Sequence, residues 1–129
     1  MNINNYIGLN HNYGELDCIT LIKFFYEHEL GISFDLPDYC KSKRWMYTFT
    51  EQELNSWICK YAIKTTLTSA QNYDLIAFKS KNNMINHFAM FLAPASILHV
   101  EESSISKIET LSDYWIDSIY AVYRHEQLV

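Results

Sequence analysis

One cysteine and two histidines in this chain have the types and positions that nucleophilic catalysis requires. Cys18 follows a polar, glycine-containing turn over residues 10–16 and opens a segment with helical patterning. A helix start presents exposed N–H groups and the positive end of the helix dipole, which favour thiolate over thiol. His87 and His99 lie on two short strand-like runs. A thiolate, an imidazole and a group that orients the imidazole are the parts of a cysteine hydrolase.

The positions of the two histidines allow their rings to meet on one face of a sheet. Alternate side chains of a strand share a face, so His87 and His99 can share one if their runs pair as a hairpin. A helix N-terminus packed across that face would bring Cys18 to His87. His87 would then take the thiol proton and later protonate the leaving amine, while His99 fixes the tautomer of His87. The backbone N–H of Cys18 is a candidate oxyanion donor.

The patterning predicts helices first and strands afterwards. One helix is expected over residues 17–30 with Gly31 ending it, and a second from the capping box Thr50–Glu53 to about Ala62. A turn of helix is expected near residues 112–115. Strands are expected over short apolar runs at 74–78, 87–92, 97–100 and 119–124. This order predicts an α+β fold in which N-terminal helices pack on an antiparallel sheet.

Length and composition are those of one folded domain. The 129 residues predict a single domain over 1–129, and a hydrophobic content of 49% is ample for one core. The net charge of −5 argues against nucleic acid as a partner, because phosphate contacts need clustered Lys and Arg. The basic run at residues 41–44 is better explained as a short solvated loop.

The N-terminal residues and the spacing of the cysteines favour synthesis in a reducing compartment. Residues 1–5 have neither a basic nor an apolar stretch of the kind that opens a signal peptide. Apolar runs fall short of the roughly 20 residues that a membrane helix needs, so no membrane partner is expected. The cysteines Cys18, Cys40 and Cys59 form no CxxC pair, and free thiols are the simple interpretation.

Each of these residues also has an ordinary structural interpretation. On position alone, Cys18 could equally be a small buried apolar residue, because it lies one turn before Ile22 on the inner face of its helix. A lone histidine on a strand is more often structural. A zinc site built from Cys18, His87 and His99 ranks below the triad, since that ligand set lacks a carboxylate. We therefore expect no metal and no cofactor.

Six segments resemble, in order along the chain, the signature segments of the NlpC-type cell-wall cysteine peptidases, a compact branch of the papain-like fold. The segment Gly14-Glu15-Leu16-Asp17-Cys18-Ile19-Thr20-Leu21-Ile22 is similar to their Gly-x-x-Asp-Cys-x-x-Leu-Val signature. Asn86-His87-Phe88-Ala89-Met90-Phe91 is similar to the strand that carries their catalytic histidine. The other four segments are residues 30–32, 73–78, 97–99 and 120–124.

The resemblance implies a mechanism, a substrate and a setting. It implies that Cys18 is the nucleophile, His87 the base and His99 the orienting residue. The family cleaves stem-peptide amide bonds of peptidoglycan, commonly between D-glutamate and a diamino acid, without a metal. The segment at residues 6–9 and the tight Asp-Cys turn are similar to small tail-associated peptidases of bacteriophages and gene transfer agents. That likeness implies a place in the virion tail, with other tail proteins as partners.

Departures from the family pattern concern the oxyanion site above all. The tyrosine that many members place before the glycine aligns best with His11, and Tyr13 lies nearby; with Asp17 they form the expected oxyanion and substrate set. Tyr73 replaces the usual glycine before the 74–78 strand. Two alternatives therefore stay open: a structural tail component that keeps the fold and cuts poorly or not at all, and an amidase, transpeptidase or acyltransferase that uses the same triad.

Overall fold

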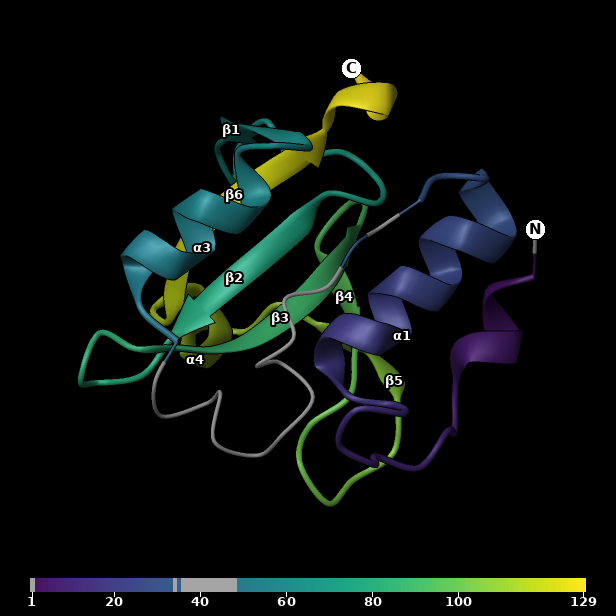
Figure 1. The fold of residues 1–129 in the computed structure, drawn as a ribbon. Helices are drawn as coiled ribbons and strands as arrows, with labels where there is room; N and C mark the ends of the chain where they lie inside the picture. Colours follow the sequence, from purple (N-terminus) through teal and green to yellow (C-terminus); the bar gives the residue numbers. More distant parts are fainter. Residues whose placement is uncertain (1, 34, 36–48) are drawn as a thin grey trace.

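One antiparallel sheet forms the body of the protein, and helices cover both of its faces (Figure 1). The computed structural model describes residues 2–33, 35 and 49–129. The strand order is β1-β6-β2-β3-β4-β5. The strands are β1 Ala62–Thr65, β2 Leu75–Lys79, β3 Ile85–Leu92, β4 Ser96–His99, β5 Lys107–Thr110 and β6 Ile119–His125. The helices are η1 Ile3–Tyr6, α1 Cys18–Phe25, η2 Tyr26–Leu30, α3 Glu51–Ile58, α4 Asp113–Ile116 and η4 Glu126–Leu128.

The first helix begins and ends where the sequence predicts. Asp17 is the N-cap of α1: its side chain accepts hydrogen bonds from the N–H groups of Ile19 and Thr20, and its own N–H donates to Thr20 Oγ1. The chain turns into this cap through Gly14, whose φ of 77° suits glycine. After α1 the helix widens into one π-helical turn, η2. Gly31 ends this turn at a φ of 65°.

The second long helix is shorter than expected. Thr50 caps α3 as predicted, its Oγ1 accepting from Glu53 N at 3.2 Å. The prediction that the helix runs to about Ala62 is wrong, because α3 ends at Ile58 and Ala62 begins β1 opposite His125 of β6. Pairing along a sheet edge outweighs the helical spacing of the aromatic residues there.

The four predicted strands are present, and two further ones complete the sheet. β1 and β5 are the edge strands, four residues each, with partly buried and exposed residues along their length. Such short strands of mixed polarity carry little apolar alternation, so the sequence pattern does not single them out. The turn of helix predicted near residues 112–115 is α4. The predicted α+β architecture of helices on an antiparallel sheet is confirmed.

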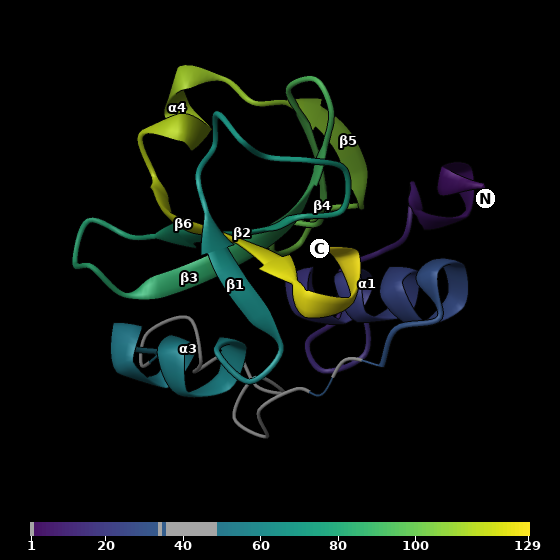
Figure 2. The same cartoon turned by 90° about the horizontal axis from the view of Figure 1, so that it is seen from above.

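Two apolar clusters fill the two faces of the sheet. Figure 2 shows α1 and α3 on one side of the sheet and α4 on the other. The larger cluster joins the helices α1 and α3 to Phe88, Met90 and Leu98. The smaller cluster joins Ala89, Phe91 and Ile97 to Trp115 of α4, among others. Because strand side chains alternate, His87 and His99 belong to the α4 side.

An ion pair fixes the centre of the sheet. Asp74 is fully buried just before β2, and both of its carboxylate oxygens accept hydrogen bonds from Arg124 of β6, at 3.0 and 2.9 Å. Arg124 also donates to the Ser69 carbonyl. Tyr73, which replaces the usual glycine, adopts a φ of 79°, and its carbonyl accepts a hydrogen bond from the Tyr26 hydroxyl. Contacts of this kind hold a non-glycine residue in the left-handed region.

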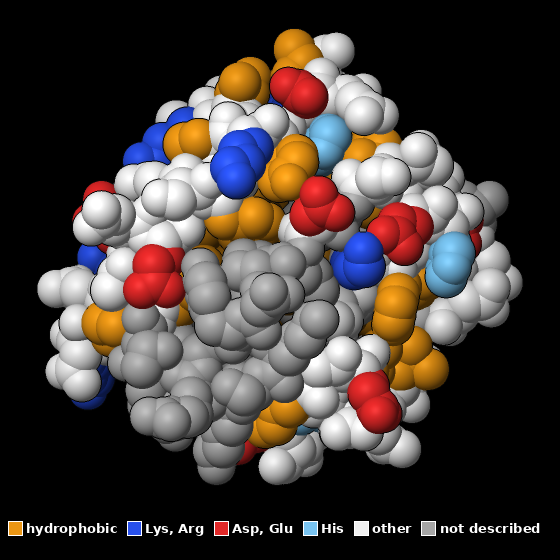
Figure 3. Space-filling view, in the orientation of Figure 1, with side chains coloured by type: hydrophobic (Ala, Val, Ile, Leu, Met, Phe, Trp, Pro, Cys, Tyr) orange, Lys and Arg blue, Asp and Glu red, His pale blue; other side chains and the backbone are white. Residues whose placement is uncertain are grey.

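The surface carries charges of both signs. In Figure 3 acidic and basic side chains are interspersed on the face that it shows. Cys59 is a free, exposed thiol, whereas Cys40 and the basic run at residues 41–44 lie outside the described residues. Within the part of the chain that the structure describes, none of the helices is both long enough and apolar enough to cross a bilayer.

Candidate active site

His87 and His99 are joined directly on the α4 side of the sheet. His87 Nε2 lies 2.9 Å from His99 Nδ1, and the ring centroids are 5.1 Å apart. Strand register explains this contact: Met90 of β3 pairs with Leu98 of β4, so His99 and His87 are diagonal neighbours on one face. The expectation that both imidazoles share a sheet face is confirmed. The contact engages Nε2 of His87 and leaves its Nδ1 for another partner.

A β-bulge turns His87 toward this position. Along β2, Phe78 pairs with His87 but the next residue, Lys79, pairs with Ile85, so Asn86 is an extra residue in β3. A bulge bends its strand and re-aims the neighbouring side chains. The His87 ring consequently lies against Phe78, with ring centroids 5.6 Å apart. Bulges are common beside active sites, where they aim a functional side chain.

Trp115 of α4 supports both histidines from outside the sheet. Its ring centroid lies 5.4 Å from that of His87 and 5.1 Å from that of His99. His99 is completely buried, whereas His87 keeps part of its surface exposed. The indole therefore covers the His99 ring and leaves the His87 ring open to a cavity and a groove.

Cys18 reaches His87 from the other side of the sheet. The expectation that the helix packs across the histidines' own face is wrong: α1 belongs to the opposite cluster, with Phe88 and Met90. The first residue of the helix nevertheless lies beside His87, because Cys18 and His87 line one small cavity of about 20 Å³. Cys18 is only 4% exposed. The cysteine and the histidine pair are thus brought together, but through the end of the helix rather than its side.

The histidine pair is held in its neutral form. Burial lowers the pKa of His87 well below its ordinary value, and the neighbouring His99 and His11 lower it further. Burial also lowers the pKa of His99, although the carboxylates of Glu109 and Glu101 oppose that shift. A neutral imidazole can accept a proton, so the environment preserves the basic form of His87 into mildly acidic solution.

The structure places the three residues of the expected oxyanion set beside Cys18. His11, Tyr13 and Asp17 line the same cavity, and the rings of His11 and Tyr13 meet edge to face at 4.5 Å. The carboxylate of Asp17 accepts hydrogen bonds from four donors: the N–H groups of Gly14, Ile19 and Thr20 and the Thr20 hydroxyl. An ionised carboxylate only accepts. Asp17 therefore holds the turn and the helix, and within the expected set the side-chain donors at the cavity are His11 and Tyr13.

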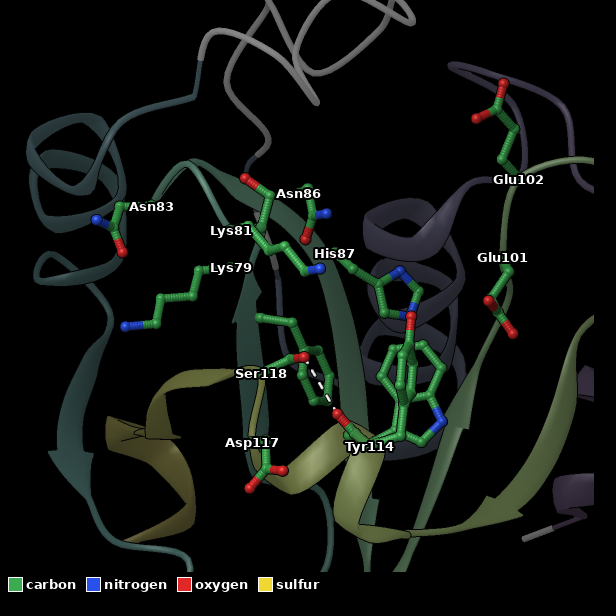
Figure 4. Close-up of a pocket in the computed structure, with 13 residues that line it drawn as sticks. Lys79, Lys81, Asn83, Asn86, His87, Glu101, Glu102, Tyr114, Asp117 and Ser118 are labelled. Atoms are coloured by element: carbon green, nitrogen blue, oxygen red, sulfur yellow. Dashed lines mark hydrogen bonds between the residues drawn. The ribbon is translucent and has the colours of Figure 1, made fainter.

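A larger groove of about 660 Å³ opens beside the cavity. Asn86, His87 and Glu102 line both spaces, so the groove leads to the cysteine. Figure 4 shows Lys79 and Lys81 on one side of His87, with Glu101 and Glu102 on the other. Tyr114 and Trp115 of α4 complete the wall.

One group of residues has ligand types for a metal ion, and it differs from the set considered from the sequence. Among the described residues, His99, Glu101 and Glu109 place one ligand atom each within 4.8 Å of one another. Lys107 Nζ lies 3.5 Å from a Glu101 oxygen and 3.4 Å from a Glu109 oxygen. Because Lys107 already supplies positive charge to the carboxylates of Glu101 and Glu109, we interpret the cluster as an ion-pair network.

The residues that support this site have little local signal in the sequence. Glu109 lies on the unpredicted strand β5, and Trp115 was placed only on a helical turn. Lys79 and Lys81 lie in the polar stretch 79–83, whose composition predicts a turn after the 74–78 strand. Their roles depend on which elements meet across the sheet, and only Trp115, a large aromatic residue in a polar segment, carried a signal of its own.

A helix that begins with a cysteine, on an antiparallel sheet carrying two joined histidines, is the arrangement of a papain-like cysteine peptidase. The family model of the NlpC/P60 family matches residues 6–124, and the chain belongs to that family. This is a family of cell-wall cysteine peptidases and hydrolases that act on peptidoglycan peptides. The resemblance inferred from the sequence segments is confirmed at the level of family and fold.

A solved structure supports the fold. The chain is similar, with a TM-score of 0.63 and 23% identity, to a crystal structure from Staphylococcus aureus subsp. aureus Mu50 described as similar to lipoprotein, NLP/P60 family. The match covers 93% of this chain and 37% of that one, so the chain spans little more than a third of the other protein's length. A search of curated proteins gave no match.

Proposed function

We propose that the protein is a cysteine endopeptidase that cleaves amide bonds in peptidoglycan stem peptides through Cys18, His87 and His99. The observation that carries this proposal is the 2.9 Å contact between the two histidines, in a site whose outer histidine shares a cavity with the cysteine at a helix start. Family membership supplies the substrate class. In this proposal Cys18 is the nucleophile, His87 the base and His99 the orienting group, which are the three roles that acyl transfer needs.

In the first half of the reaction, the Cys18 sulfur attacks the carbonyl carbon of the scissile amide. His87 takes the thiol proton on Nδ1, because its Nε2 is engaged with His99. The tetrahedral intermediate collapses when the C–N bond breaks, and His87 returns the proton to the leaving amine. The product is a thioester between the substrate acyl group and Cys18.

In the second half, water hydrolyses the thioester. His87 removes a proton from the water, which attacks the thioester carbonyl, and then protonates the departing Cys18 sulfur. His99 keeps the ring of His87 in place through both halves. Atoms and charge balance over the cycle without any further reactant.

The oxyanion needs donors on the Cys18 side of the carbonyl. The Asp17 side chain already accepts from the N–H groups of Ile19 and Thr20, so these two do not face the substrate. The backbone N–H of Cys18 is the donor we assign from the helix, with Tyr13 or His11 as the second.

The groove beside His87 suits a peptide that carries charges of both signs. Lys79 and Lys81 lie on one side of His87, and neither takes part in an ion pair among the described residues. Glu101 and Glu102 lie on the other side. A substrate with a free carboxylate near one end and a free amine near the other would align its scissile bond between these walls. We propose that the lysines bind the carboxylate.

We further propose that the enzyme acts in a bacteriophage tail, where it opens the cell wall, with other tail proteins as partners and the virion tail as its location. The support is the likeness of residues 6–9 and of the tight Asp17-Cys18 turn to tail-associated peptidases. Immunolabelling of purified virions with an antibody to this chain would test the location. Absence of the chain from particles would refute it.

Digestion of purified peptidoglycan tests the activity. Cys18→Ala should abolish release of muropeptides while leaving the circular dichroism spectrum unchanged, whereas Cys59→Ala, which alters an exposed thiol, should keep full activity. Mass spectrometry of the products separates peptide cleavage from amidase, transpeptidase or acyltransferase chemistry. Alkylation by iodoacetamide near neutral pH should favour Cys18 over Cys40 and Cys59. Equal labelling would count against a poised thiolate.

A second candidate function is a structural one. Cys18 is only 4% exposed, and its cavity of about 20 Å³ has room for little more than one water molecule. A tail component that retains the fold and cuts poorly would have such a site. In that case Cys18→Ala would leave both wall digestion and phage infectivity unchanged.

A further inference from the structure

Glu109 of β5 stands at the end of the histidine pair that is remote from Cys18. Its Oε2 lies 3.5 Å from His99 Nε2, and the same oxygen accepts a hydrogen bond from Trp115 Nε1. Its Oε1 lies 3.4 Å from Lys107 Nζ. Groups on two sides therefore hold the carboxylate against the buried imidazole.

The nitrogen that faces Glu109 has no hydrogen-bond partner among the described residues. His99 is completely buried, and its Nε2 makes no hydrogen bond with acceptable geometry there. At 3.5 Å the Glu109 oxygen is too far for a hydrogen bond but close enough to act as a charge. A proton on Nε2 is stabilised by that negative charge, while a lone pair on Nε2 is repelled by it.

This charge selects one of two hydrogen-bond directions in the pair. A neutral histidine carries one ring proton, so a proton on His99 Nε2 leaves His99 Nδ1 as an acceptor. The 2.9 Å contact then requires His87 to donate from Nε2. His87 Nδ1 is left without a proton, as a base toward the cavity that it shares with Cys18. The opposite direction would put the proton on His87 Nδ1 and remove the base.

We infer that Glu109 is a fourth member of this site, a positioning residue that sets the tautomers of His99 and His87 and so keeps the base facing Cys18. Its consequence for activity rests on the proposed peptidase function, whereas its effect on the tautomers does not. When His87 takes the thiol proton, the same carboxylate stabilises the positive charge through His99.

The surroundings keep Glu109 ionised. Burial acts to raise its pKa, but the Trp115 donor, His99 and Lys107 together hold the pKa below its usual value. Glu101 is the other acidic group at this end, and it too is paired with Lys107. One lysine between two carboxylates leaves net negative charge beside His99.

Nuclear magnetic resonance of protein with ¹⁵N-labelled histidine reads the tautomers directly. In the wild type at about pH 7.5, both His87 and His99 should carry their proton on Nε2. In Glu109→Gln a share of His99 should carry it on Nδ1, and kcat should fall about ten-fold or more with little change in KM. Glu109→Asp, which keeps the charge, should restore the wild-type tautomers in large part.

A matched control removes an ion-paired glutamate elsewhere. Glu27→Gln removes the charge of the glutamate that lies 2.6 Å from Lys23; neither residue lines the cavity or the groove, and the change should affect neither tautomers nor activity. A proton on Nδ1 of His99 in the wild type would overturn the inference, as would unchanged tautomers in a folded Glu109→Gln variant. The peptidase proposal is tested separately, by whether Cys18→Ala abolishes release of muropeptides. An inactive wild type with the expected tautomers would refute the peptidase proposal and leave the Glu109 inference in place.

Discussion

His87 and His99 share one short contact, 2.9 Å between Nε2 and Nδ1, and both rings are kept neutral by their surroundings. Because of this pair, the free energy of unfolding should depend on pH. An unfolded histidine takes up a proton near pH 6.5, whereas these two, with lowered pKa values in the folded state, resist protonation until lower pH. His87 faces His99 and His11, and His99 faces Glu109, Glu101 and Lys107.

The free energy of unfolding should therefore fall as the pH drops below about 6.5. Above that pH neither state binds the extra proton, and below it only the unfolded state does. Each histidine then contributes a slope of up to about 1.4 kcal/mol per pH unit. Urea denaturation between about pH 7.5 and about pH 5 should show this loss. His99→Gln should reduce the slope of the free energy of unfolding against pH by up to about 1.4 kcal/mol per pH unit. His28→Gln, at an exposed position, should leave this slope unchanged. Identical slopes in all three proteins would contradict the prediction.

The oxyanion donors can be separated by two conservative changes. Tyr13 and His11 both line the cavity at Cys18. If the Tyr13 hydroxyl supplies the second donor, Tyr13→Phe should lower kcat about 100-fold with KM nearly constant, because the lost bond forms mainly in the transition state. His11→Gln should then have the smaller effect. Tyr61→Phe, remote from the cavity, serves as the control in steady-state assays on a synthetic stem peptide. The reverse ranking would assign the donor role to His11.

Local signals in the sequence predicted the elements that carry the site. The glycine turn before Asp17 predicted a helix start at Cys18, and the apolar runs predicted strands that place His87 and His99 on one face. These features depend on neighbours along the chain. The family segments added the order in which they occur.

The remaining features depend on which elements meet in space. The bulge at Asn86 follows from pairing with β2, and Glu109 reaches His99 only because β5 adds to the sheet edge beside β4. α1 packs on the face opposite the histidines, where its apolar side chains join the larger cluster. The residues around Asn86, Glu109 and α1 do not determine these contacts by their own local sequence. This explains why the residues that support the site were not predicted.

Asp17 should matter more to stability than an ordinary helix cap. Its carboxylate accepts four hydrogen bonds in a buried position, whereas Thr50 at the start of α3 accepts one backbone hydrogen bond. Asp17→Ala should lower the free energy of unfolding by about 3 kcal/mol, against about 1 kcal/mol for Thr50→Ala. Asp17→Asn should recover part of the loss. Chemical denaturation of the three variants at about pH 7.5 measures this. Equal losses for the Asp17 and Thr50 alanine variants would show that only the cap bond counts.

The groove lysines should set the preference for a charged substrate. Lys79→Gln and Lys81→Gln should each raise KM about two- to five-fold, with kcat little changed, for a peptide that carries a free carboxylate beside the scissile bond. Exposed charge pairs are worth little, so the double variant should show the clearer effect. Lys60→Gln, at an exposed lysine just beyond α3, is the matched control. Conversion of the substrate carboxylate to a primary amide should raise KM for the wild type and remove most of the difference between wild type and double variant. If the double variant lost affinity equally for the acid and the amide, the lysines would shape the groove without binding the carboxylate.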